Sequence, residues 1–214
     1  SSVLILGETG VGKEMAARSI HENSVRRDKP FVAVNCGALP ETLLESELFG
    51  YKAGAFTGAT KDKPGRFAMA GSGTLFLDEI GEISPKMQID LLRVLEDRQI
   101  CRIGSSQTLG VDFRLISATR RNLEKEIGQG TFRRDFFYRI NVIEIRIPPL
   151  RQRKSDIPLL IEHFLKKYSH ETTKHVDHIT PAGQAILMAY DWPGNVRELE
   201  NVIERAVVLS KNRT

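Results

Sequence analysis

The sequence predicts an α/β fold, a three-layer domain with a five-stranded, mostly parallel sheet, followed by a small all-helical C-terminal lid. Three observations lead to this prediction. Short apolar runs alternate with segments of helical periodicity, a glycine-rich turn follows the first run, and only helical patterns occur beyond PPLRQR. Strand–helix alternation is typical of parallel sheets with helices on both faces. We expect two domains, over residues 1–148 and 149–214.

Five apolar runs are expected to form the strands of this sheet. Each is short, is bounded by turn residues and is rich in β-branched or aromatic side chains. Nearly continuous apolar runs indicate strands that are buried on both faces. The runs are VLIL (Val3–Leu6), FVAVN (Phe31–Asn35), TLFLD (Thr74–Asp78), FRLISAT (Phe113–Thr119) and VIEIRI (Val142–Ile147).

Seven segments have the apolar spacing or the boundary residues of helices. Four lie between the strands and three follow PPLRQR, where Thr180 is a candidate N-cap. The seven segments are Lys13–Glu22, Glu41–Leu48, Pro85–Asp97, Asn122–Gly128, Asp156–Ser169, Pro181–Tyr190 and Asn195–Leu209.

Composition restricts the class of protein. The 41% hydrophobic and 27% charged residues are ordinary for a folded domain, and the net charge of +4 permits an anionic partner such as a nucleotide or nucleic acid. The two cysteines, Cys36 and Cys101, do not suggest a disulfide scaffold and fit a reducing cytosol. No apolar run is long enough to span a bilayer, so no membrane association is expected. Both ends look like cuts in a longer protein.

The first glycine-rich turn has the pattern of a phosphate-binding loop. GETGVGK matches G-x-x-x-x-G-K between an apolar run and a helical segment. Backbone N–H groups of such a loop wrap the phosphates of ATP, and the lysine reaches the outer phosphates. Glu14 stands where a Ser or Thr usually binds Mg²⁺, so phosphates, water and another carboxylate must hold the metal. The candidate nucleotide-binding residues are Gly7, Glu8, Thr9, Gly10, Val11, Gly12, Lys13 and Glu14.

Two adjacent acids end the third apolar run, TLFLDE. We expect Asp78 to orient Mg²⁺, through water, and Glu79 to polarise the attacking water. The alternative is a purely structural role, in which the two acids cap a turn at the end of a strand. A base beside Mg-ATP predicts a hydrolase, since no pocket for a phosphate acceptor is indicated.

Six motifs together resemble one known family. The motifs are GETGVGKE, GAFTGA, GTLFLDEIGEIS, FRRDFFYRINV, PPLRQR and YDWPGNVRELEN, and they extend over essentially the whole chain. They resemble the central P-loop AAA+ domain of bacterial enhancer-binding proteins, the NtrC-type activators of sigma-54 RNA polymerase, many of which act in two-component systems. The resemblance implies a ring, a hexamer in the family, that hydrolyses ATP and remodels the closed promoter complex of the sigma-54 holoenzyme. It also implies that enhancer DNA is bound by a separate domain absent from this chain.

GAFTGA is the most specific of these motifs. In the family it forms the tip of a mobile loop that contacts sigma-54. The resemblance implies that Phe56 is the apolar anchor, that Thr57 responds to the nucleotide state, and that Gly54 and Gly58 give the backbone freedom. From composition alone, a phenylalanine folded back into the core is equally reasonable. The candidate partner-binding residues are Gly54, Ala55, Phe56, Thr57, Gly58 and Ala59.

Other catalytic roles follow from the resemblance, each with a structural alternative. Asn35 is similar to the family's switch residue, which holds Glu79, although a strand-end asparagine can simply satisfy backbone groups. Thr119 matches the sensor position near the γ-phosphate. Arg120 follows it where the family commonly has Asn or His, and it either faces the nucleotide or solvent.

Three arginines match positions that stabilise phosphate charge in the family. Arg133 and Arg139 are similar to fingers that reach the ATP site of the neighbouring subunit, and Arg197 is similar to a second sensor on the lid. The alternatives are a surface salt bridge for either finger and a helical pair with Glu200 or Asn201 for Arg197.

Two other classes of function compete with this interpretation. Another AAA+ remodelling ATPase, such as a helicase loader or protein unfoldase, would carry an aromatic pore loop in place of GAFTGA. A stand-alone DNA-binding module is disfavoured, because the last helical segment offers only Arg197 and Arg205 for basic readout. His175 and His178 lack the further ligands of a zinc site, and a solvated loop is the better interpretation.

Overall fold

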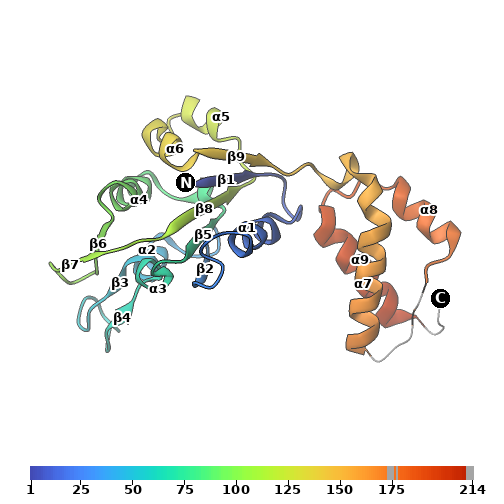
Figure 1. Ribbon diagram of the computed structural model, residues 1–214, viewed down its shortest axis with the longest axis horizontal. Coiled ribbons are helices and arrows are strands. Elements are labelled where there is room, and N and C mark those ends of the chain that lie inside the picture. Colours follow the sequence, from blue (N-terminus) through green and yellow to red (C-terminus); the bar gives the residue numbers. More distant parts are fainter. Residues whose placement is uncertain (173–175, 177, 211–214) are drawn as a thin grey trace. The chain divides into compact units, whose positions relative to one another are not determined.

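The computed structural model describes residues 1–172, 176 and 178–210 (Figure 1). The chain folds into two compact units. The first contains Ser1–Leu6 and Lys13–Arg146, and the second contains Gly7–Gly12 and Ile147–Thr214. The domain boundary expected after residue 148 stays a prediction. Unlike the expected division, the structure groups the glycine-rich turn with the second unit.

The first unit contains a five-stranded sheet in the order β2-β5-β8-β1-β9. Every neighbouring pair in it is parallel. The α/β fold and the five-stranded sheet are therefore confirmed, with each strand within one residue of its expected bounds at either end. The strands are β1 (Val3–Leu6), β2 (Phe31–Asn35), β5 (Thr74–Asp78), β8 (Arg114–Thr119) and β9 (Ile143–Arg146).

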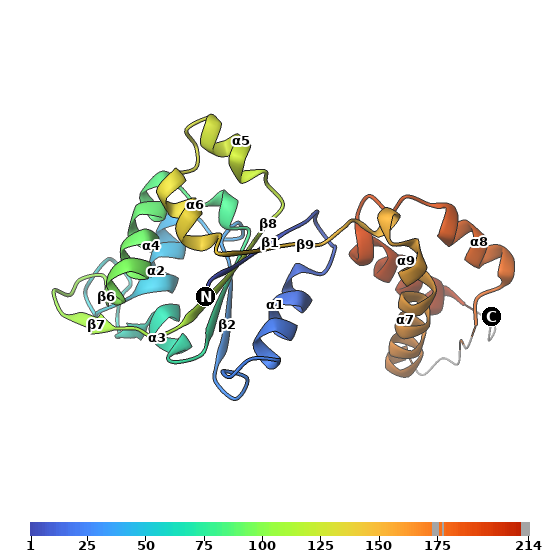
Figure 2. The same cartoon turned by 45° about the horizontal axis from the view of Figure 1, so that its top comes forward.

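The strand order determines which helices cover each face of the sheet. The connection from β1 to β2 crosses the sheet in the opposite direction to all the later connections. Because such crossovers are right-handed, α1 (Lys13–Glu22) lies on one face and the later helices lie on the other, as Figure 2 shows. The later helices are α2 (Glu41–Phe49), α3 (Arg66–Ala70), α4 (Pro85–Asp97), α5 (Leu123–Gly128) and α6 (Arg134–Ile140).

The main core lies between the sheet and the second set of helices. It includes the fully buried rings of Phe67, Phe113 and Phe136. The centroids of the Phe67 and Phe113 rings are 5.4 Å apart. Packing of this kind on a sheet buried on both faces explains why the strands are nearly continuous apolar runs.

The second unit is helical in its described part, apart from the glycine-rich turn. It contains α7 (Ile157–Thr172), α8 (Pro181–Ala189) and α9 (Asn195–Leu209), preceded by 3-10 turns η2 (Leu150–Gln152) and η3 (Lys154–Asp156). Thr180 caps α8 as expected, since its hydroxyl accepts from the Gly183 N–H at 3.1 Å. Trp192 and Ile157 are buried in a separate small core.

Several short elements were not predicted from the sequence. They have too few residues to show a periodicity, and Pro64 and the arginine-rich stretch before Ile140 do not resemble a strand or a helix. They are the antiparallel pair β3 (Gly50–Tyr51) and β4 (Lys63–Pro64), the antiparallel pair β6 (Gln99–Cys101) and β7 (Thr108–Gly110), the helices α3 and α6, and the 3-10 turn η1 (Ile80–Glu82).

Candidate functional site

The acidic pair lies at the carboxyl end of β5, in the first unit. Asp78 is the last residue of the strand, and one of its carboxylate oxygens accepts from the Glu79 N–H at 3.0 Å. Glu79 has a left-handed backbone, with φ of 53°. This conformation is costly for a residue with a side chain, and such strain is concentrated at functional sites.

Lys13 and Glu79 come together within the first unit. The lysine is only 7% exposed, and its Nζ lies 3.9 Å from Glu79 Oε1. The other carboxylate oxygen, Oε2, is buried and has no hydrogen-bond partner among the residues that the structure describes. A buried oxygen of this kind is an acceptor that a water or a ligand donor can satisfy. The predicted phosphate lysine and the predicted base therefore share one site.

Asn35 pairs with Asp78 in the sheet register. Its side-chain oxygen accepts from the backbone N–H groups of Gly37 at 2.9 Å and Ala38 at 3.1 Å. This is the backbone-satisfying role that the sequence left open. Burial raises the pKa of the neighbouring Cys36 thiol to about 12, with a further contribution from the charges of Asp78 and Glu79. Cys36 is thus a neutral, buried thiol of the core.

Thr119 is fully buried at the end of β8. Its hydroxyl accepts from the Arg121 N–H at 3.1 Å and lies 2.8 Å from where a side chain at Gly81 would begin. Arg120 is more than half exposed and lies 3.5 Å from Glu82. Arg121 was not singled out from the sequence. Its guanidinium binds both carboxylate oxygens of Glu82, and this pairing raises the pKa of Arg121. The pair joins the turn after Glu79 to the end of β8.

Two glycines of the glycine-rich turn have left-handed backbone. Gly10 and Gly12 have φ of 78° and 101°. The Glu8 carboxylate accepts two hydrogen bonds from the Arg151 guanidinium, at 2.6 and 2.9 Å, and one from the Asn195 amide at 3.1 Å. These bonds lower the pKa of Glu8 to about 2, with Arg151 the larger cause. Neither Arg151 nor Asn195 was singled out from the sequence.

Arg197 lies in the first turn of α9, beside the glycine-rich turn. Its backbone N–H donates to the Gly10 carbonyl at 3.3 Å, and its side chain is exposed. In the described part of the chain its guanidinium makes no ion pair with Glu200, which instead accepts from Lys167 at 2.8 Å and from Tyr168. The alternative in which Arg197 pairs with Glu200 along the helix is therefore not found in the described part of the chain.

Both candidate finger arginines are engaged within the first unit. Arg133 immediately precedes α6 and binds Asp135, with 3.0 Å between Nε and Oδ1. Its pKa is raised by this carboxylate. Arg139 donates to the Leu95 carbonyl at 2.7 Å. Arg133 thus has the surface salt bridge that the sequence left as an alternative, while Arg139 is held by the last turn of α4.

The GAFTGA loop runs between β3 and β4. Its ends are joined by a hydrogen bond of 2.7 Å from the Gly54 N–H to the Ala59 carbonyl. Gly54 and Gly58 have positive φ, of 81° and 100°. Phe56 is 45% exposed and packs edge-on against Tyr51, with 4.9 Å between ring centroids. The phenylalanine is therefore outside the core, and Tyr51 supports it.

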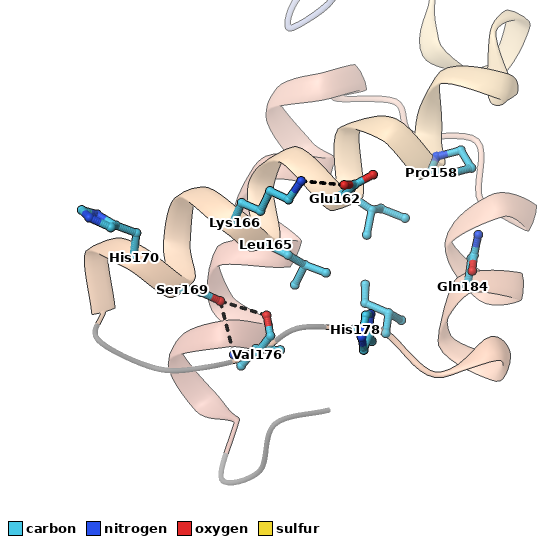
Figure 3. A pocket seen from close by; sticks show the side chains of 11 residues that line it. Pro158, Glu162, Leu165, Lys166, Ser169, His170, Val176, His178 and Gln184 are labelled. Atoms are coloured by element: carbon cyan, nitrogen blue, oxygen red, sulfur yellow. Dashed lines mark hydrogen bonds and ion pairs between the residues drawn. The ribbon is translucent and has the colours of Figure 1, made fainter.

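A pocket of about 910 Å³ in the second unit contains none of the candidate residues. Figure 3 shows the Glu162–Lys166 ion pair and the hydrogen bonds of Ser169 to Val176 among its lining residues. Among the described residues no three His, Cys, Asp or Glu side chains gather as a metal site, and His175 lies outside them. No described helix is long and apolar enough to cross a membrane.

Comparison with known proteins identifies the family. Residues 1–146 match the sigma-54 interaction domain and residues 151–214 match the AAA+ ATPase lid domain. The chain is 56% identical over 209 residues to the transcriptional regulatory protein ZraR of Salmonella typhimurium, covering 98% of this chain and 47% of that protein. It is 54% identical over 211 residues to the Nif-specific regulatory protein of Herbaspirillum seropedicae, covering 99% and 39%. It therefore spans about half the length of the curated relatives or less.

Solved structures agree with this assignment. NtrX from Brucella abortus in complex with ADP is 39% identical, with a TM-score of 0.92, over 100% of this chain and 47% of that one. Hsp104 of S. cerevisiae, in its extended complex with casein, has a TM-score of 0.69 at 21% identity over 97% of this chain and 40% of that one, which shows the fold alone. The chain belongs to the sigma-54 interaction domain family and carries the AAA+ domain and lid of sigma-54-dependent transcriptional activators.

Proposed function

We propose that this domain hydrolyses ATP with Mg²⁺ and uses the energy to remodel the closed promoter complex of sigma-54 RNA polymerase in the bacterial cytoplasm. The observation that carries the proposal is the Glu79 site. Glu79, a left-handed residue immediately after β5, has one buried carboxylate oxygen with no hydrogen-bond partner in the described part of the chain, and its other oxygen faces the Lys13 ammonium. A base held in this way can accept a proton from water.

The residues of each unit fit the nucleotide. In the second unit, the left-handed glycines expose backbone N–H groups to phosphate, and the NtrX structures with ADP and with ATP support this ligand. In the first unit, Lys13 would bind the outer phosphates and Asp78 would hold Mg²⁺, which supplies charge neutralisation. Glu14 would contribute through its backbone, because its carboxylate binds Arg18 at 2.7 Å.

The remaining candidates would act on the γ-phosphate. Asn35 and Thr119 lie at the carboxyl ends of β2 and β8 and would report the nucleotide state to Glu79. Arg197 would contact phosphate from the lid. Arg133 and Arg139 would act on a neighbouring subunit of a hexameric ring, and each would first leave its present partner, Asp135 or the Leu95 carbonyl.

The GAFTGA loop would transmit hydrolysis to sigma-54. The half-exposed Phe56 ring offers apolar contact area, and the two glycines let the loop change shape. A nucleotide state drives such a change only if the loop binds its partner differently in that state. Enhancer DNA would be bound by another domain of the whole protein.

The proposal is tested by size-exclusion chromatography of the domain with sigma-54. Co-elution is expected with ADP plus aluminium fluoride, which mimics the γ-phosphate during transfer, and not with ADP alone. Thr57→Ala should abolish co-elution, while Thr60→Ala, an exposed threonine just outside the motif, should retain it. A domain that forms rings and hydrolyses ATP but never co-elutes would be an AAA+ remodelling ATPase with another partner.

A further inference from the structure

Asn195 connects three separate segments of the second unit. It is the first residue of α9 and is 0% exposed, with a left-handed φ of 54°. Its amide nitrogen donates to Glu8 Oε2 at 3.1 Å, to the Thr9 carbonyl at 3.0 Å and, more weakly, to the Pro193 carbonyl at 3.4 Å. Its amide oxygen accepts from the Leu150 N–H at 2.8 Å. Only an amide supplies both donors and an acceptor here.

The backbone beside Asn195 is joined to the same turn. The Gly10 carbonyl accepts from the N–H groups of Val196 at 3.0 Å and Arg197 at 3.3 Å. It therefore satisfies donors that the first turn of α9 would otherwise leave without an intrahelical partner. The turn and the start of α9 thus form one hydrogen-bonded block that includes the backbone of Arg197.

The acceptor that faces the Asn195 amide is a permanent carboxylate. Arg151 holds Glu8 from the other side, and the Glu8 pKa of about 2 keeps the group ionised throughout the physiological range. Other charged groups near this junction, among the described residues, include Arg153, which donates to the Val11 carbonyl at 2.7 Å and lies 3.5 Å from Asp156. Glu198 accepts from the Gly194 N–H at 2.8 Å, and the charge of Asp191 acts on Arg151. A second carboxylate in place of the Asn195 amide would face Glu8 without a donor.

We propose that Asn195 is a positioning residue for nucleotide binding, which sets the conformation of Glu8, Thr9 and Gly10 and aligns Arg197 with them. This inference rests on the proposed function, because the turn is the phosphate-binding loop only if the domain binds nucleotide. A loop that binds phosphate through backbone N–H groups depends on their orientation before the ligand arrives. Asn195 supplies that orientation from a buried position and without touching the ligand.

The test replaces one amide with a carboxylate. Asn195→Asp keeps the size of the side chain and tolerates the left-handed backbone, but it removes the donor to Glu8 and Thr9. Binding of a fluorescent ADP analogue by the full domain is measured for wild type, Asn195→Asp and the matched control Asn201→Asp, an exposed asparagine on the same helix. We expect about a tenfold loss of affinity at about pH 8 for Asn195→Asp alone.

Two further affinity measurements distinguish a positioning role of Asn195 from a role in packing alone. Acidification to about pH 5 should restore affinity to Asn195→Asp, because two facing carboxyl groups share a proton and the protonated one donates. Wild type should show no such recovery. The double variant E8Q/N195D should also bind the nucleotide more tightly than Asn195→Asp, because the glutamine amide at position 8 donates to the new carboxylate. Its affinity is compared with that of E8Q alone.

Each outcome decides the inference. Unchanged affinity in Asn195→Asp, or a loss that neither acid nor E8Q relieves, overturns it. Should the single variant not fold, recovered folding and affinity in E8Q/N195D support the inference, and a double variant that stays unfolded overturns it. A wild-type domain that binds no nucleotide would instead refute the proposed function.

Discussion

Gly10 and Gly12 are a matched pair for testing how the glycine-rich turn is held in the second unit. Both belong to the second unit and both have positive φ, but their surroundings differ. A Cβ added to Gly10 would lie 2.3 Å from the Gly194 carbonyl oxygen and 3.1 Å from the Arg197 Cβ. A Cβ added to Gly12 would meet no atom of the described residues within 4 Å.

This difference in surroundings sets how much unfolding free energy each alanine variant should lose. A side chain in left-handed backbone costs about 1–2 kcal/mol, which both alanine variants incur. Gly10→Ala also makes the new Cβ overlap the Gly194 carbonyl, which belongs to the backbone and cannot rotate away as a side chain can. Overpacking of this kind costs about 1–3 kcal/mol. For a small unit with an m-value of about 1 kcal/mol/M in urea, the midpoint of Gly10→Ala should fall about 1–3 M below that of Gly12→Ala.

Trp192 makes this measurement specific. It is the single tryptophan of the chain and is buried in the core of the second unit, so its fluorescence reports the unfolding of that unit. Urea titrations without nucleotide would be compared for wild type and both variants. Equal midpoints for Gly10→Ala and Gly12→Ala would refute the close approach of Gly10 to Gly194.

Other perturbations test the remaining parts of the site. Glu79→Gln should retain nucleotide binding but lose hydrolysis about a hundredfold or more in a phosphate-release assay, and retained turnover would exclude the base role. Phe56→Ala should leave the urea midpoint of the first unit, followed by far-UV circular dichroism, nearly unchanged, because the ring is 45% exposed, yet weaken sigma-54 co-elution. Cys36, neutral with a pKa of about 12, should resist alkylation in the folded protein at about pH 8 while exposed Cys101 reacts. Equal labelling, followed by mass spectrometry, would contradict its burial.

Sequence patterns alone determined the sheet, the glycine-rich turn and the loop motif. Apolar runs such as Leu75–Leu77 indicate buried strands directly, and the glycine motif accounts for the left-handed glycines. Each pattern lies within a few neighbouring residues, so the sequence alone can show it. The order of residues in GAFTGA is specific enough to indicate the family. Composition could not decide whether the Phe56 ring is exposed.

Only the tertiary structure decided which groups these residues contact. Asn195 meets Glu8 across 187 positions of sequence, Arg151 meets it across 143, and Arg139 meets the Leu95 carbonyl across 44. Such interactions form when packed elements bring distant segments together, so no local pattern encodes them. The sequence thus determined which chemical groups the protein has. The fold determined that Glu79 is strained beside Lys13 and that a buried asparagine, Asn195, is hydrogen-bonded to the glycine-rich turn.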